Sequence, residues 1–182
     1  ALLCTTNAKE SQTPEKVDQE SAGEVGFAAL FDGKSLDGWS GNLKYFRVED
    51  GAIVAGTMKE KVPNNEFLTF KESFTDFELR LKCKLVGEGG NAGIQIRSRR
   101  PTKEELESDD KKTRLPAHEM VGYQVDMGKA WKKVWWGKLY DESRRRKVLA
   151  EPYDEAKLES ITKWNDWNDY RIWVKGDQIK IW

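Results

Sequence analysis

Two short runs of alternating apolar and polar residues constrain the fold of this chain most strongly. The first runs from Asn91 to Ser98 and the second from Gly122 to Met127. A period of two residues is typical of a β-strand with one apolar face, because successive side chains point to opposite sides of a sheet. The sequence therefore predicts two strands that each bury one face and present polar groups on the other.

The polar faces of these two strands carry an unusual set of groups. Gln95 and Arg97 are in phase on the first strand, and Gln124 and Asp126 are in phase on the second. Equivalent positions on neighbouring strands lie about 5 Å apart, so we expect the four side chains to project into one cleft. A guanidinium, two amides and a carboxylate together can form hydrogen bonds with a ligand that carries many hydroxyl groups. The alternative is an ordinary solvated sheet face, because any half-buried sheet alternates in this way.

Turn signals divide the rest of the chain into short segments. Asp32-Gly33, Asp50-Gly51 and the glycine-rich run from Gly87 to Gly90 are examples. Short alternating runs separated by such turns predict an all-β sandwich. Helical periodicity is weak except near 102–110 and 154–162, where we expect short helices in loops.

The length of the chain favours one domain with a tail. A chain of 182 residues is long enough for one sizeable core and too short for two, and we place the domain at residues 26–182. The alternating run 178–182 reaches the last residue, so we expect the sandwich to lack C-terminal strands and the natural protein to continue past Trp182.

Residues 1–25 differ in composition from the domain. After Ala1-Leu2-Leu3-Cys4 the chain is rich in Lys, Glu, Gln, Ser and Thr, and such a stretch buries too little apolar surface to fold. We expect a disordered exported tail, either a lipoprotein tether acylated at Cys4 or the end of an ordinary secretory signal. Both interpretations place the protein in the periplasm or at the cell surface, and the lipoprotein interpretation adds a lipid on Cys4 as its contact with a membrane.

The charged residues and the cysteines exclude several classes of site. Lys+Arg and Asp+Glu both total 31, so no net field attracts nucleic acid. Cys83 falls on the apolar phase of a predicted strand, which favours a buried free thiol. The single histidine, His118, excludes sites that need two or more imidazoles. No cofactor is evident, and a metal here would be a divalent cation bound by oxygen ligands.

A long, highly charged segment joins the two strands described first. It extends from Arg99 to Ala117, and it begins beside Arg97 and ends at His118-Glu119. Loops of this length are usually functional or disordered. The segment is expected to be either a lid over the polar face or a solvated insertion.

Six short signatures follow one another along the chain. They are Phe31-Asp32-Gly33-Lys34-Ser35-Leu36-Asp37-Gly38-Trp39, Val48-Glu49-Asp50-Gly51-Ala52-Ile53, Asp76-Phe77-Glu78-Leu79-Arg80, Asn91 to Ser98, Gly122 to Met127, and Gly137-Lys138-Leu139-Tyr140-Asp141. In this order they resemble the 3-keto-disaccharide hydrolase domain family over roughly residues 27–182. The resemblance implies a concanavalin A-like jelly roll of two antiparallel sheets, in agreement with the strand pattern.

The resemblance also implies a chemistry, which is the cleavage of glycosides already oxidised to a ketone at C3 of the sugar. The ketone acidifies the hydrogen on C2, so a base removes it, the glycosidic oxygen leaves C1, and water adds to the resulting enone. Such a site needs a base, a donor for the developing enolate, and an acid for the leaving oxygen. The alternative is a noncatalytic, lectin-like carbohydrate-binding module on the same scaffold.

Candidate residues for both activities lie on the polar strands and beside them. We expect Arg97 to donate hydrogen bonds to the enolate or to a ring hydroxyl. Where the family often has Glu then Gln, this chain has Gln124 then Asp126, which leaves the catalytic carboxylate open. The candidate proton carriers are Asp126, Glu119 and His118, and the candidate substrate-binding residues are Gln95, Gln124, Tyr140, Trp135 and Trp136. The two tryptophans are adjacent, so only one of them faces the cleft if the segment is extended.

Overall fold

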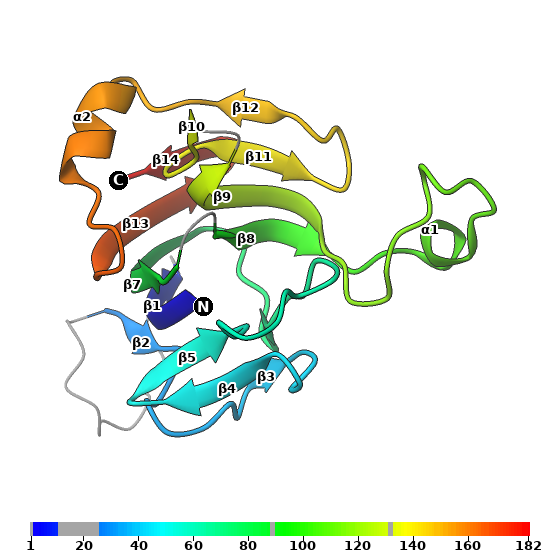
Figure 1. The fold of residues 1–182 in the computed structure, drawn as a ribbon, viewed down its shortest axis with the longest axis horizontal. Coiled ribbons are helices and arrows are strands. Elements are labelled where there is room, and N and C mark those ends of the chain that lie inside the picture. Colours follow the sequence, from blue (N-terminus) through cyan, green and yellow to red (C-terminus); the bar gives the residue numbers. More distant parts are fainter. Residues whose placement is uncertain (1, 11–25, 88–89, 131–132) are drawn as a thin grey trace.

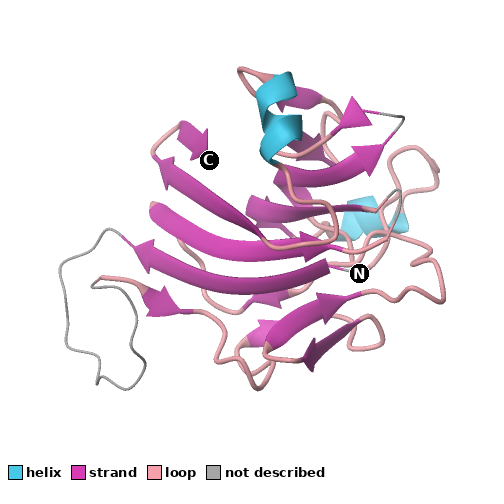
Figure 2. Ribbon diagram, turned by 60° about the vertical axis from the view of Figure 1, so that its left-hand side comes forward, coloured by secondary structure: helices cyan, strands magenta, loops and turns pink. Residues whose placement is uncertain are grey.

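The computed structural model describes residues 2–10, 26–87, 90–130 and 133–182. Two antiparallel sheets pack against each other, and Figures 1 and 2 show that strands form most of the molecule. This arrangement confirms the predicted all-β sandwich of the jelly-roll type.

The first sheet has the strand order β14-β13-β7-β1-β5-β4, and β2 pairs with β1. Its strands are β1 (Leu2–Glu10), β2 (Ala28–Ala29), β4 (Phe46–Glu49), β5 (Ala52–Ala55), β7 (Phe77–Leu85), β13 (Asn168–Lys175) and β14 (Gln178–Ile181). The hairpin between β4 and β5 turns at Asp50 and Gly51, whose φ angles are 52° and 74°. Two consecutive positive φ values suit a two-residue hairpin turn and explain the Asp-Gly signal in the sequence.

The second sheet is built around β9, which pairs with β8, β10 and β11, and β11 pairs in turn with β12. Its strands are β8 (Asn91–Arg99), β9 (Val121–Ala130), β10 (Lys133–Val134), β11 (Leu139–Glu142) and β12 (Val148–Ala150). A separate two-stranded pair joins β3 (Trp39–Ser40) to β6 (Thr69–Phe70). The two strands that dominated the sequence pattern are therefore neighbours, as expected.

The apolar faces of the two sheets meet in one core. The first sheet contributes alternate residues of β7 and β13, and the second contributes residues of β8, β9 and β11. Cys83 is fully buried and is a free thiol, which confirms the prediction from its phase. The most buried members of the core are Cys83, Val125, Met127, Ile172 and Val174.

The N-terminal segment differs from the expected disordered tail. Leu2–Glu10 forms β1, which lies between β7 and β5, and its register places Cys4 opposite Cys83. The two threonines after Cys4 favour strand conformation, and the insertion pairs the edges of β7 and β5 that are not covered by β13 and β4. This placement differs from a free lipid-anchored tether; the rest of the predicted tail, residues 1 and 11–25, lies outside the described residues.

Two short helices lie near the positions that the sequence indicated. The helix α1 (Lys103–Glu107) has a capping box between Thr102 and Glu105, and α2 (Glu155–Ile161) is capped by Asp154. Figure 1 shows α1 in an arm that extends away from the ends of β8 and β9. The segment from Arg99 to Ala117 is therefore an arm that projects from the sandwich rather than a layer spread over the sheet. Neither helix in the described ranges is long and apolar enough to cross a membrane.

Candidate functional site

The polar face of the second sheet brings together residues from β8, β9 and β11. Gln95 on β8 pairs with Gln124 on β9, which in turn pairs with Tyr140 on β11. Their neighbours Ile96, Val125 and Leu139 lie in the core. Because side chains alternate along a strand, the two glutamines and the tyrosine share the opposite face. The structure thus confirms that Gln95 and Gln124 lie side by side.

Gly93 provides room for a contact within this face. A Cβ atom at Gly93 would lie 2.4 Å from Cγ of Gln124, so the side chain of Gln124 crosses β8 at the glycine. In this position Nε2 of Gln124 donates a hydrogen bond of 2.7 Å to Oδ1 of Asp126. The site therefore requires glycine at position 93, because any side chain there would displace Gln124.

Replacing Gly93 by alanine should displace Gln124 and reduce the stability of the fold. We expect a loss of about 1–3 kcal/mol in the free energy of unfolding, the usual cost of overpacking, measured by urea denaturation. Removing the side chain of Gln124 in a Gly93→Ala/Gln124→Ala double variant should recover part of the loss. Strictly additive losses would show that the two residues do not compete for space.

Asp126 is a buried carboxyl group at the centre of this face. Its exposed fraction is 2%. Burial, together with the nearby charge of Glu142, raises the pKa of Asp126 to about 7, although the bond from Gln124 and the charge of Lys138 oppose the rise. Asp126 therefore changes its charge near neutral pH, where most aspartates are fully ionised.

The backbone of Asp126 is fixed partly by the opposite sheet. The hydroxyl of Tyr170, on β13, crosses the core and donates a hydrogen bond of 2.9 Å to the carbonyl oxygen of Asp126. The same hydroxyl accepts a bond of 2.8 Å from the amide of Gly137. The amide of Asp126 donates to the carbonyl of Lys138 at 2.9 Å. Each backbone polar group of Asp126 is therefore satisfied by a defined partner.

Glu142 is a second carboxyl group on this face, and the sequence analysis missed it. It lies at the end of β11, two residues after Tyr140, and therefore in the same phase. Its Oε1 accepts a hydrogen bond of 3.1 Å from the amide of Ser143, and burial followed by the charge of Glu119 raises the pKa of Glu142. The alternation of apolar and polar residues from Leu139 to Glu142 could have indicated that Glu142 shares a face with Tyr140.

Glu119 lies close to Glu142 but is held by other partners. It is 4% exposed, and its carboxylate accepts bonds from the side chain of Asn65 at 3.3 Å and from the amide of Met120 at 3.0 Å. His118, the residue before it, is exposed. The structure therefore brings Glu119 to the acidic end of the polar face and places His118 on the surface.

Arg97 lines one groove with Gln95 and Gln124, as expected, but its charged partner is Asp76 rather than Asp126. A β-bulge interrupts the pairing between Ile96 and Arg99, and Arg97 adopts a left-handed backbone conformation with φ of 45°. Its guanidinium donates to the carbonyl of Thr75 at 3.3 Å and lies 3.5 Å from Asp76. The bulge thus turns Arg97 toward the chain that leads into the first sheet.

A groove of about 1060 Å³ runs beside β8. Its polar lining includes Gln95, Arg97, Gln124 and Glu142, and Asn65 is on the facing loop, whereas Asp126 is not among the lining residues. The amide group of Gln95 is buried, and both of its polar atoms lack a hydrogen-bond partner among the described residues. Because an unpaired buried amide is costly, a polar ligand would stabilise this part of the groove.

The adjacent tryptophans lie at a turn and take different directions. Trp135 packs edge-on against Tyr140, with ring centroids 6.1 Å apart, and borders the polar face. Trp136 is 3% exposed and packs against Tyr170 in the core. The prediction that Trp136 contacts a substrate is therefore wrong, because its ring is enclosed between the two sheets.

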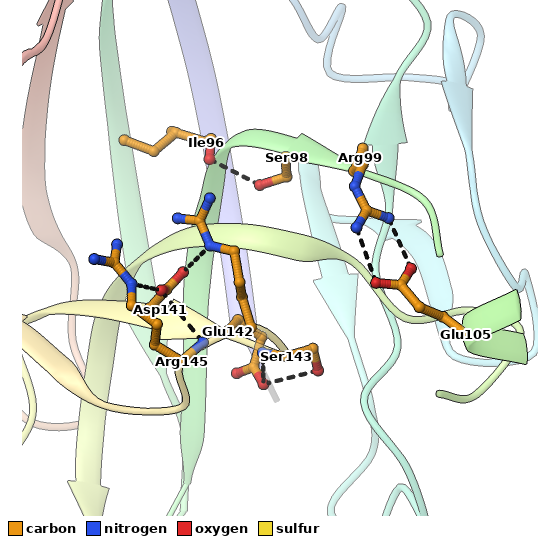
Figure 3. Close-up of polar contacts among 9 residues, drawn as sticks. Ile96, Ser98, Arg99, Glu105, Asp141, Glu142, Ser143 and Arg145 are labelled. Carbon is orange, nitrogen blue, oxygen red and sulfur yellow. Dashed lines mark hydrogen bonds and ion pairs between the residues drawn. The ribbon is translucent and has the colours of Figure 1, made fainter. Parts of the chain in front are cut away.

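The turn after β11 holds Glu142 in place through its neighbour Asp141. Asp141 is fully buried and accepts bonds from Nε of Arg144 at 2.8 Å and from Nε of Arg145, as Figure 3 shows for the labelled residues. Burial alone would raise the pKa of Asp141, but the bonds from Arg145 and Arg144 outweigh it and hold the pKa below its ordinary value. Figure 3 also shows the paired bonds between Arg99 and Glu105 that close the base of the arm.

Metal ligands are not grouped at this site. Within the described parts of the chain, no three His, Cys, Asp or Glu side chains are arranged to hold a metal ion. An oxygen-ligated divalent cation therefore stays a prediction of the sequence analysis.

Comparison with known proteins places the chain in a family. The family described as 3-keto-alpha-glucoside-1,2-lyase-like domain matches residues 26–182. A relative from Bacteroides thetaiotaomicron named 3-keto-disaccharide hydrolase is 31% identical over 93 residues, which cover 47% of this chain and 32% of the relative. The aligned part thus spans about a third of that relative's length. By the extent of the match, this chain belongs to the family of 3-keto-alpha-glucoside-1,2-lyase-like domains.

Proposed function

We propose that this domain cleaves 3-keto-glycosides by removing the proton on C2, eliminating the group on C1 and adding water to the product. The observation that carries the proposal is the pair of carboxyl groups on one polar face, Asp126 and Glu142, whose pKa values are both raised. A raised carboxyl pKa brings a general acid or base closer to the operating pH. The family match supports the same class of reaction.

Glu142 is the residue that we assign as the base. It lines the groove, whereas Asp126 does not, and a base must come within hydrogen-bond reach of the proton it takes. In the proposed reaction the electron pair of the C2–H bond forms the enolate and then expels the oxygen on C1. The proton taken by Glu142 is available for the leaving oxygen, and water then adds at C1.

The amides of the groove are proposed to hold the sugar and the developing enolate. The amide of Gln95 has no partner of its own among the described residues, and Gln124 is oriented by its bond to Asp126. Preoriented donors of this kind stabilise developing charge better than mobile water does. Asp126 is thus proposed to act through Gln124 as a positioning residue, and Trp135 and Tyr140 to form the edge of the sugar subsite.

A direct assay distinguishes this proposal from the noncatalytic alternative. The purified protein is incubated with a 3-keto-glucoside and, separately, with the unoxidised parent glucoside, and sugar release is measured. We expect release from the keto substrate alone, because only the ketone acidifies C2–H. Binding of either sugar without release from any keto-glycoside would support a carbohydrate-binding module instead.

The exported location is also proposed from the sequence alone. A lipid on Cys4 would be detected as added mass on the N-terminal peptide of the native protein. An unmodified Cys4 in a membrane-free fraction would contradict the lipid anchor.

A further inference from the structure

A buried cation lies at the end of the polar face opposite to Glu142. The side chain of Lys138 is only 6% exposed, and its ammonium nitrogen lies 2.7 Å from Oε1 of Glu155 and 3.0 Å from Oε1 of Glu151. The two glutamate side chains are 55% and 60% exposed. Burial lowers the pKa of Lys138, but the bonds from Glu155 and Glu151 outweigh it and hold the pKa above its ordinary value, so the ammonium stays charged.

Lys138 is the direct backbone neighbour of Asp126. The amide of Asp126 donates to the carbonyl of Lys138 at 2.9 Å, and the next residue, Leu139, pairs with Val125. Since Leu139 points into the core, Lys138 and Asp126 point to the same polar face. On the other side Asp126 is opposite Gly93, which has no side chain. The ammonium of Lys138 also lies 5.9 Å from the ring of Trp135.

The other groups around Asp126 are neutral or negative. Gln124 from β9 donates a neutral hydrogen bond, and Glu142 and the Tyr140 hydroxyl come from β11. From the opposite sheet, the Tyr170 hydroxyl bonds the carbonyl of Asp126. Lys138 is therefore the cation that acts on Asp126 within the described residues.

We propose that Lys138, Glu151 and Glu155 form a positioning cluster that attaches the segment between β12 and α2 to the polar face and favours the ionised form of Asp126. The proposal rests on the proposed function in so far as Asp126 positions Gln124 for the reaction. A positive charge in a water-poor site favours the ionised carboxyl group, and the two glutamates reduce that effect. The two exposed glutamates thus influence the ionisation of Asp126, which is itself buried from solvent.

Two variants should shift the titration of Asp126 in opposite directions. In Lys138→Met the cation is lost and the shape is nearly kept, so the midpoint should rise by about one pH unit. In the double variant Glu151→Gln/Glu155→Gln the ammonium is less compensated, so the midpoint should fall. The readout is the carboxyl carbon signal of Asp126 in nuclear magnetic resonance, assigned by its loss in Asp126→Asn. The exposed Lys175→Met serves as the control and should leave the midpoint unchanged.

The outcomes separate this inference from the proposed function. A purely structural role would loosen α2 in both variants and would not produce shifts of opposite sign, so equal or absent shifts would overturn the inference. If Lys138→Met does not fold, the double variant Glu151→Gln/Glu155→Gln tests the inference by itself. A lower midpoint of the Asp126 titration would support the inference, and an unchanged midpoint would overturn it. With an active protein, the pH dependence of cleavage of a 3-keto-glucoside should move in the same directions. Absence of cleavage by the wild-type protein would overturn the proposed function and would leave the titration result standing.

Discussion

Replacing Glu142 by glutamine is expected to lower kcat on a 3-keto-glucoside by about 10²- to 10⁴-fold, the usual contribution of a general base. The amide oxygen of glutamine still accepts the bond from Ser143, so the turn and the groove should keep their shape. Steady-state kinetics with the variant and the wild-type protein test this. KM should change little, because the lost interaction belongs to the transition state.

Glu119→Gln is the matched control for this experiment. Glu119 is a neighbouring carboxylate that is already bonded to Asn65 and Met120, so we expect a much smaller loss of kcat. A variant Glu142→Gln with undiminished kcat, together with an inactive Asp126→Asn, would transfer the role of base from Glu142 to Asp126.

Replacing Asp126 by asparagine is expected to stabilise the protein at pH 8 and to have little effect at pH 4. The pKa of Asp126 is about 7 in the fold, against an ordinary value of 3.8. Because the folded pKa is raised, the stabilising contribution is complete below pH 3.8 and is lost as the pH rises through about 7. At about 1.4 kcal/mol per pH unit, the ionised group costs up to about 4 kcal/mol. Asparagine stays neutral and still accepts the bond from Gln124.

Urea denaturation at a series of pH values measures this difference. The gap between the variant and the wild-type protein should widen between pH 4 and pH 8. The exposed Asp177→Asn should show no such widening. The free energies of unfolding of Asp126→Asn and the wild type could instead differ by the same amount at every pH. Asp126 would then ionise at its ordinary pKa, and its ionisation would not destabilise the fold.

The sequence predicted the parts of the structure that depend on strand phase. Gln95 and Gln124 are cross-strand partners, Cys83 points into the core, and Trp135 and Trp136 point to opposite sides. The first two follow from the period of two along an extended backbone, whereas the two tryptophans diverge across the turn between β10 and β11. The turn at Asp50-Gly51 was likewise visible, because few residue pairs adopt two positive φ angles.

The parts that were missed depend on departures from regular phase or on contacts distant in sequence. The bulge at Arg97 places a non-glycine residue at positive φ, and no apolar pattern reveals such a bulge. Glu142 is in phase with Tyr140, but the sequence does not show that β11 ends beside the groove or that Asp141 is bonded to Arg144 and Arg145. The pairing of β1 with β7 joins segments about seventy residues apart, which local propensity does not predict.

The hydrogen bond from Tyr170 to the carbonyl of Asp126 determines where motion can occur during turnover. It joins the centre of β9 to β13 through the core, so the backbone at Asp126 can be exposed only when the two sheets separate. Its amide should therefore exchange with solvent at the slow rate of global unfolding. A ligand that enters the groove must then be admitted by movement of the loop that carries Asn65, which lines the groove, while the backbone at Asp126 stays fixed.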